Sequence, residues 1–142
     1  MRKYIFLIIS ILWTLVILSF STQSGETSGS ISYAITLYIH NFVHSFLPNL
    51  EFDTLHLIIR KCAHIGEYAV LGLLYGMTSY QFKINRYVII IPGLIIALID
   101  EGIQIISVDR GPSLIDALLF DFPGYLIGIF IIVMFYKKIF KI

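Results

Sequence analysis

Long apolar runs alternate with short polar segments along the chain, and this pattern predicts four membrane-spanning helices. A helix of about 20 apolar residues is long enough to cross the hydrocarbon core of a bilayer. We expect spans over residues 4–20, 62–81, 87–106 and 114–136. Pro92 lies close to the start of the third expected span, where a proline disturbs a helix least. The first run is longer than the apolar core of a signal peptide, so we expect a retained helix.

The segment from Ser30 to Leu47 has apolar residues on one helical face and a polar stripe on another. The stripe consists of Ser32, Thr36, His40 and His44. This pattern is typical of an interfacial helix, which Pro48 would end. His40 and His44 have the spacing of metal ligands on a helix, but nothing else in the segment supports a metal, so we expect a solvated face. Asp53 is expected to cap the next helix, which continues to about Tyr80.

The composition is that of a small integral membrane protein. Of the 142 residues, 58% are hydrophobic and 13% are charged, and the mean hydropathy is +0.88. These values exclude a soluble domain, and the few scattered bases exclude nucleic-acid binding. The single cysteine, Cys62, excludes an internal disulfide and a multi-cysteine metal site. We predict one all-α domain over residues 1–142, with four transmembrane helices and an extracytoplasmic interfacial helix.

The distribution of basic residues predicts the orientation. One side of the four-span arrangement holds Arg2, Lys3, Lys83, Arg86, Lys137, Lys138 and Lys141. Basic residues are enriched on the cytoplasmic side of membrane proteins, so both termini are expected there. Residues 21–60 and 107–113 then lie outside, and all the acidic residues lie outside or in the outer half of a span.

A cluster of ionisable residues occurs where the second expected span begins. His64, Glu67 and Tyr68 share one helical face, and Arg60 and Lys61 lie on it or at its edge. Ionisable groups inside a membrane are costly and are therefore functional candidates. The alternative is a structural helix end, in which the two bases extend to the interface and His64 pairs with Glu67.

Two further spans carry polar residues at a similar outer depth. They are Asp100, Glu101 and Gln104 in the third span, and Asp116 and Asp121 in the fourth. We expect His64, Glu67, Asp100, Glu101, Gln104, Arg110 and Asp116 to meet in one cavity, with the three outer bases at its rim. Five carboxylates against three bases and a histidine leave negative charge uncompensated. Some carboxylates must be protonated, or a cation must join them.

The fourth span is irregular because Pro123 lacks a backbone donor and frees the carbonyl near Leu119. This predicts either a broken helix lining a cavity or a plain proline kink. Gly124 and Gly128 form a small-xxx-small pair, which favours close helix packing.

Taken together, these motifs resemble the VanZ-like membrane proteins, named for a teicoplanin-resistance protein of enterococci. The matching residues, in order, are Phe20-Ser21-Thr22-Gln23, Arg60-Lys61, His64, Glu67-Tyr68, Leu71-Gly72, Asp100-Glu101, Gln104, Arg110, Asp116, Gly124 and Gly128. The family usually has asparagine at the position of Asp121 and a small residue at that of Pro123. The resemblance implies a multi-span protein of the bacterial plasma membrane with a link to lipoglycopeptide resistance or envelope biology.

Three functions are compatible with these residues. The first is an extracytoplasmic site that binds or modifies an envelope molecule, plausibly a lipid-linked intermediate or a lipoglycopeptide. Its candidate catalytic residues are Lys61, His64, Glu67, Asp100, Glu101, Gln104 and Asp116, and its candidate ligand-binding residues are Arg60, Arg110, Tyr68 and Gln23. A divalent cation is compatible with this set, although no complete metal signature is present.

The second function is non-catalytic, with the polar residues forming an ion-pair network in a structural or shielding membrane protein. The third is transport, which would need a dimer because four helices are few for a solitary transporter. We rank binding or modification first and transport last.

Overall fold

The computed structural model describes residues 2–85, 87–111 and 113–140. Its helices are α1 (Arg2–Ser21), α2 (Gly25–Val43), α3 (Phe52–Phe82), α4 (Ile90–Ile106), α5 (Leu114–Asp116) and α6 (Phe122–Phe140), with a π-helical segment, η1 (Ala117–Asp121), between the last two. No strand occurs in the described ranges, so the prediction of an all-α fold is confirmed. Arg86 and Lys141, which entered the orientation argument, lie outside these ranges.

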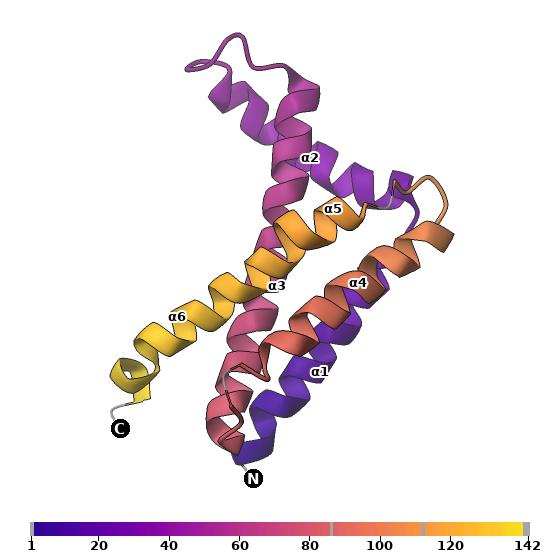
Figure 1. The fold of residues 1–142 in the computed structure, drawn as a ribbon. Helices are drawn as coiled ribbons and strands as arrows, with labels where there is room; N and C mark the ends of the chain where they lie inside the picture. The colour runs from indigo at the N-terminus through magenta and orange to yellow at the C-terminus, as the bar shows by residue number, and fades with distance from the viewer. Residues whose placement is uncertain (1, 86, 112, 141–142) are drawn as a thin grey trace.

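The long helix α3 is the centre of the arrangement. It packs against α6 along much of its length, and it also contacts α1 and α2. Helices α1 and α4 lie side by side, and α2 crosses the end of α3 that extends beyond the other helices (Figure 1). The start of α1 and the end of α6 lie at the opposite end of the molecule from α2 (Figure 1). The placement of both termini on the cytoplasmic side stays a prediction.

All four expected spans are helical, but they differ in how well they suit a bilayer. Within the described part of the chain, two stretches are long and apolar enough to cross a membrane by length and composition, Tyr4–Ser21 and Leu114–Phe135. Helix α3 mixes apolar residues with charged ones such as Glu67, and α4 has 17 residues. The four-span topology therefore stays a prediction. Most residues of both apolar stretches are at least partly exposed, as lipid contact would require.

Several helix boundaries differ from the sequence expectation. Helix α2 ends at Val43, before the end expected at Pro48, and α4 begins at Ile90 rather than at residue 87. Helix α2 begins at Gly25 rather than Ser30, because the Ser24 hydroxyl accepts the Thr27 backbone N–H at 3.2 Å and caps the helix. The prediction that Asp53 caps α3 is wrong. Glu51 occupies the cap position without a side-chain hydrogen bond, and Asp53 lies in the first turn, where a negative charge favours the helix dipole.

The irregularity around Pro123 takes the form of a π turn. The Phe122 N–H reaches back five residues to the Ala117 carbonyl, and η1 ends at Asp121, two residues before the proline. A π turn inserts an extra residue, so it rotates the preceding side chains relative to α6. The expected break in the fourth span is thus a π segment rather than a plain kink. Its consequence is to place the Asp121 side chain in the interior, fully buried.

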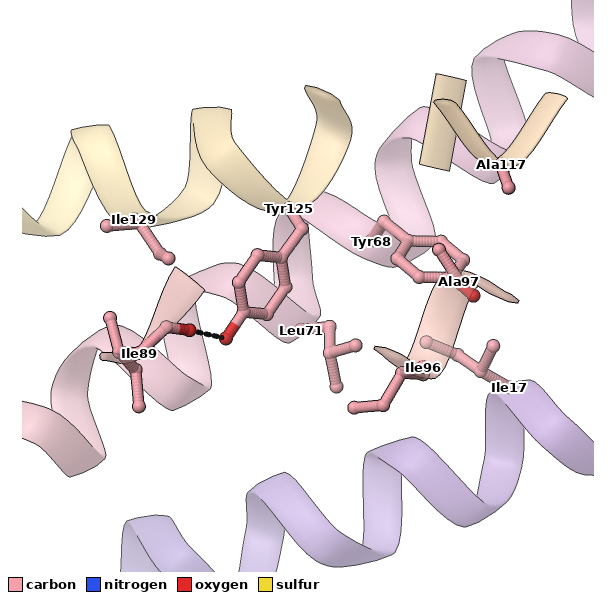
Figure 2. Close-up of a cluster of buried hydrophobic side chains, with 9 residues drawn as sticks. All are labelled: Ile17, Tyr68, Leu71, Ile89, Ile96, Ala97, Ala117, Tyr125 and Ile129. Atoms are coloured by element: carbon pink, nitrogen blue, oxygen red, sulfur yellow. Dashed lines mark hydrogen bonds between the residues drawn. The ribbon is translucent and has the colours of Figure 1, made fainter. Parts of the chain in front are cut away.

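The core lies between α3, α4 and α6. Tyr125 lies at the centre of the core and donates a hydrogen bond of 2.7 Å to the Ile89 carbonyl. Tyr68 and Ala117 lie at one end of the core, and Ile89 and Ile129 lie at the opposite end (Figure 2). Glycines let α3 and α6 approach closely. A Cβ on Gly124 would lie 2.6 Å from the Ile65 carbonyl oxygen, and one on Gly128 would overlap the Ala69 carbonyl. The small-xxx-small interpretation is therefore confirmed.

Candidate functional site

A cavity of about 190 Å³ lies between α1, α2, α3, α4 and the segment after α4. One part of its lining is apolar and consists of Ile17, Phe20, Ile31, Ile35, Ile59 and Ala63. The other part is polar and consists of Ser21, Gln23, Ser28, Ser32, Arg60, His64, Glu67, Asp100 and Arg110. The cavity has room for several water molecules or a group the size of phosphate. Its lining suits a molecule with an apolar part and a charged part.

Arg110 is held at the cavity by the chain that follows α1. Its guanidinium donates to the carbonyls of Phe20 at 2.8 Å and Gln23 at 3.2 Å, and to Gln104 Oε1 at 3.4 Å. Burial lowers the pKa of Arg110 from its usual value, and the positive charge of Arg60 lowers it further. The two arginines are therefore close enough for their charges to repel each other.

Arg60 differs from Arg110 in its partners. Among the described residues, no carboxylate forms an ion pair with Arg60, although its side chain lines the cavity. A half-buried guanidinium with an open fork of donors is a ready partner for a planar or tetrahedral anion.

Three ionisable side chains meet at the inner end of the cavity. His64 Nδ1 lies 3.1 Å from Asp121 Oδ1, and the Ser21 hydroxyl donates to Asp100. A ligating atom from each of His64, Asp100 and Asp121 lies within 4.8 Å of the other two. The expected structural alternative, a pair between His64 and Glu67, is not the observed contact, because His64 turns toward Asp121.

Two neighbouring residues complete this inner end. The Tyr68 hydroxyl is buried beside Asp100, near enough to interact with its carboxylate. The Glu67 side chain lines the cavity, and its backbone carbonyl accepts a hydrogen bond of 3.0 Å from the Trp13 indole. That bond joins α1 to α3 next to the site.

The expectation that all the polar residues share one cavity is only partly met. Lys61 pairs with Asp116 and lies 4.7 Å from the centroid of the Phe120 ring, away from the cavity lining. Glu101 accepts the Ser113 N–H at 2.7 Å. The physical reason is helical geometry, since Glu101 is rotated by about 100° from Asp100. Outside the cavity lining, the Lys61–Asp116 pair joins α3 to α5, while Glu101 of α4 accepts hydrogen bonds from Ser113 and, at 3.4 Å, from the Gln104 amide.

The histidines of α2 show no metal-like arrangement. The rings of His40 and His44 stack with centroids 5.3 Å apart, and His40 also contacts the Phe52 ring. His44 is exposed as expected, whereas His40 is half-buried by this aromatic contact. A second cavity of about 320 Å³ lies between α3, α6 and the turn that joins α3 to α4, and most of its lining is apolar.

Sequence reasoning missed four residues of the site. Ser28 and Ser32 of α2 line the cavity, and nothing in the pattern of α2 indicated which face would meet α3. Ser21 was visible within Phe20-Ser21-Thr22-Gln23, but its bond to Asp100 depends on the packing of α1 against α4. Asp121 received no role, and the π turn that buries it has no sequence signal beyond Pro123.

A family model described as VanZ/LLP1 matches residues 6–136, which is most of the chain. No curated protein and no solved structure matches the chain.

Proposed function

The chain belongs to the VanZ/LLP1 family, and from this premise we propose that its cavity binds an amphiphilic molecule of the bacterial envelope through an anionic group. Family membership fits a teicoplanin-resistance-like membrane protein, and the two long apolar stretches support the same description. The proposal adds a site and a class of ligand to that description.

The observation that carries the proposal is the position of Arg60. Its guanidinium lines a cavity whose other walls include the apolar side chains of Ile17, Ile31 and Ile59. A phosphate or carboxylate would form charge-assisted hydrogen bonds with Arg60, and Arg110 would add positive potential. An attached acyl or prenyl chain would lie along the apolar wall. A lipid-linked envelope intermediate has both parts.

The location of the cavity supports the same class of ligand. It lies at the end of the molecule away from the termini, which the basic residues predict to be extracytoplasmic. Ligands with lipid chains can reach such a site laterally from the outer leaflet. Modification of the ligand would need a base, and Glu67 and His64 are the ionisable groups that share the cavity with Arg60. Binding is the core of the proposal, and a reaction is its extension.

A direct binding experiment tests it. The purified protein in lipid nanodiscs is titrated with a fluorescent polyprenyl phosphate and, separately, with the matching uncharged polyprenol. We expect saturable binding of the phosphate, weakened at least about tenfold in Arg60→Gln, since a charge-assisted hydrogen bond contributes about 1.5–3 kcal/mol. Cys62→Ser is the matched control, because Cys62 is exposed on the same turn of α3 and lies outside the cavity lining. Equal binding of phosphate and alcohol would contradict the proposal.

A cellular assay tests the link to resistance. Wild type, Arg60→Gln, Glu67→Gln and Cys62→Ser are expressed at matched membrane levels in a teicoplanin-susceptible Gram-positive host. We expect wild type and Cys62→Ser to raise the inhibitory concentration of teicoplanin and the two cavity variants to lose that effect. If both cavity variants protected the host as well as wild type does, resistance would not depend on the cavity.

A second candidate function is structural, and one observation favours it. Lys61 pairs with Asp116, and Glu101 holds the Ser113 N–H, so part of the polar cluster already has internal partners. In a purely structural protein, the thermal stability of variants would follow these contacts, and the cavity variants Arg60→Gln and Glu67→Gln would behave like wild type in both assays above. Transport remains the least supported function, because the cavity lies at one end of the molecule.

A further inference from the structure

We propose that His64, Asp100 and Asp121 bind one divalent transition-metal ion, with Zn²⁺ as the best match. The three residues come from three different elements, α3, α4 and η1, so the site would join the helices at the inner end of the cavity. The inference does not depend on which ligand the cavity takes.

The geometry is close to that of a metal site. Ligand atoms around a tetrahedral Zn²⁺ lie about 3.4 Å apart, given metal–ligand distances of about 2.0–2.2 Å. The nitrogen of His64 and the Oδ1 of Asp121 are already 3.1 Å apart, and all three ligand atoms lie within 4.8 Å of one another. Side-chain rotations that move the Asp100 carboxylate oxygens by about an ångström would bring Asp100 into the coordination sphere of the same ion.

A second observation points to a missing partner. Asp121 is fully buried, and its Oδ2 atom has no hydrogen-bond partner among the described residues. Buried carboxylate oxygens are normally hydrogen-bonded, ion-paired or bound to metal. The nearby bases do not supply the partner, because Lys61 pairs with Asp116 and Arg110 bonds to backbone carbonyls and Gln104. A divalent cation would neutralise Asp100 and Asp121 together.

The donor set selects the kind of ion. One imidazole nitrogen and two carboxylate oxygens suit Zn²⁺ or Mn²⁺, whereas Ca²⁺ takes six to eight oxygen ligands. Ser21 donates to Asp100 and would fix the orientation of that ligand, as outer-shell groups do in metal sites. His64 and Asp100 also line the cavity, so a fourth coordination position would face it. The π turn that places Asp121 is of a kind that occurs frequently at functional sites.

The experiment measures metal directly. The full-length protein in nanodiscs is stripped with EDTA, which is then removed, and is titrated with ZnCl₂ by calorimetry while its thermal midpoint is recorded. Bound zinc is counted by mass spectrometry after desalting. We expect one Zn²⁺ per chain and a higher midpoint in wild type. Asp121→Asn keeps the size and the hydrogen-bond acceptor, but we expect it to bind zinc at least about tenfold more weakly and to lose the shift in midpoint.

Two controls separate this site from adventitious binding. The double variant His40→Gln, His44→Gln removes the stacked histidines of α2, and Asp116→Asn removes a nearby carboxylate outside the cluster. Both are expected to bind zinc as wild type does. His64→Gln provides a second test of the cluster if Asp121→Asn fails to fold. The proposal is overturned if wild type binds no zinc, if the cluster variants bind it equally well, or if binding is lost with His40 and His44.

Discussion

At the scale of single residues, Asp121 differs most from what the sequence indicated. Its depth in the fourth span was predictable, and so was the excess of carboxylates around it. Its contact with His64 was not, because a regular helix would have placed the side chain in another direction. The depth of a polar residue can be read from its position in an apolar run. Its contact partner depends on the direction of its side chain around the helix axis, and a π turn changes that direction.

The first prediction concerns the charge of Asp121 when no metal is bound. In EDTA, Asp121→Asn should unfold at the same temperature as wild type or higher, because asparagine keeps an acceptor for His64 and removes a negative charge near Asp100. Asp121→Leu has a similar branched shape but a larger side chain, and it leaves His64 without its partner, so it should cost at least about 1–3 kcal/mol. Thermal unfolding in one detergent compares the three proteins. If asparagine destabilised as much as leucine, the charge itself would be stabilising, as in a pair with protonated His64.

At the scale of elements, the glycine spacing was a reliable guide to packing, the apolar lengths left the number of spans open, and caps and boundaries were not reliable. The pair Gly124 and Gly128 indicated close packing, and both contact the backbone of α3. The start of α2 was placed too late, since Ser24 lies in a run of small polar residues where several caps are possible. The sequence predicted that Asp100 and Glu101 point in directions about 100° apart on the helix. It did not predict which of the two faces the cavity, because that depends on how α4 packs.

A second prediction tests the glycine contact between α3 and α6. Gly128→Ala should lower the free energy of unfolding by about 1–3 kcal/mol, because its Cβ would overlap the Ala69 carbonyl and the helices would have to separate. Gly66→Ala is the matched control. It lies within α3 and has no atom within 4 Å of a built Cβ, so its higher helix propensity should leave stability unchanged or raised by up to about 1 kcal/mol. Equal losses in the two variants would contradict the close approach of α3 and α6 at Gly128.

A third prediction concerns the segment between α4 and α5. Arg110 bonds to the carbonyls of Phe20 and Gln23, and so it ties this segment to the chain after α1. Arg110→Gln should speed backbone hydrogen exchange in residues 107–111 about fivefold or more, because losing about 1 kcal/mol of local stability has that effect. Asp109→Asn is the control, since asparagine also tolerates the left-handed conformation observed at φ 55°. Unchanged exchange in Arg110→Gln would show that other contacts hold the segment.

At the scale of the whole molecule, the predicted orientation assigns most of the basic residues to one end of the helix bundle and the cavity to the other. Helix α1 begins, and helices α3 and α6 terminate, at the same end of the molecule (Figure 1). The sequence assigns seven of the ten basic residues to this end. The cavity, with Glu67 and Asp100, lies toward the other end. The apolar surfaces of α1 and α6 suit contact with lipid. The polar cavity at one end of the molecule suits the boundary between membrane and water.

The fourth prediction fixes that orientation by chemical labelling. In a Cys62→Ser background, single cysteines replace the exposed residues Glu26 in α2 and Asn85 in the turn after α3. Because basic residues near the ends of spans are retained in the cytoplasm, an impermeant thiol reagent should label position 26 in intact cells and position 85 only after the membrane is opened. A cysteine at position 85 that reacts in intact cells, with position 26 protected, would reverse the orientation. The cavity would then face the cytoplasm, and its ligand would have to come from that leaflet. The labelling pattern therefore decides between an outer and an inner source for the anionic group that Arg60 is proposed to bind.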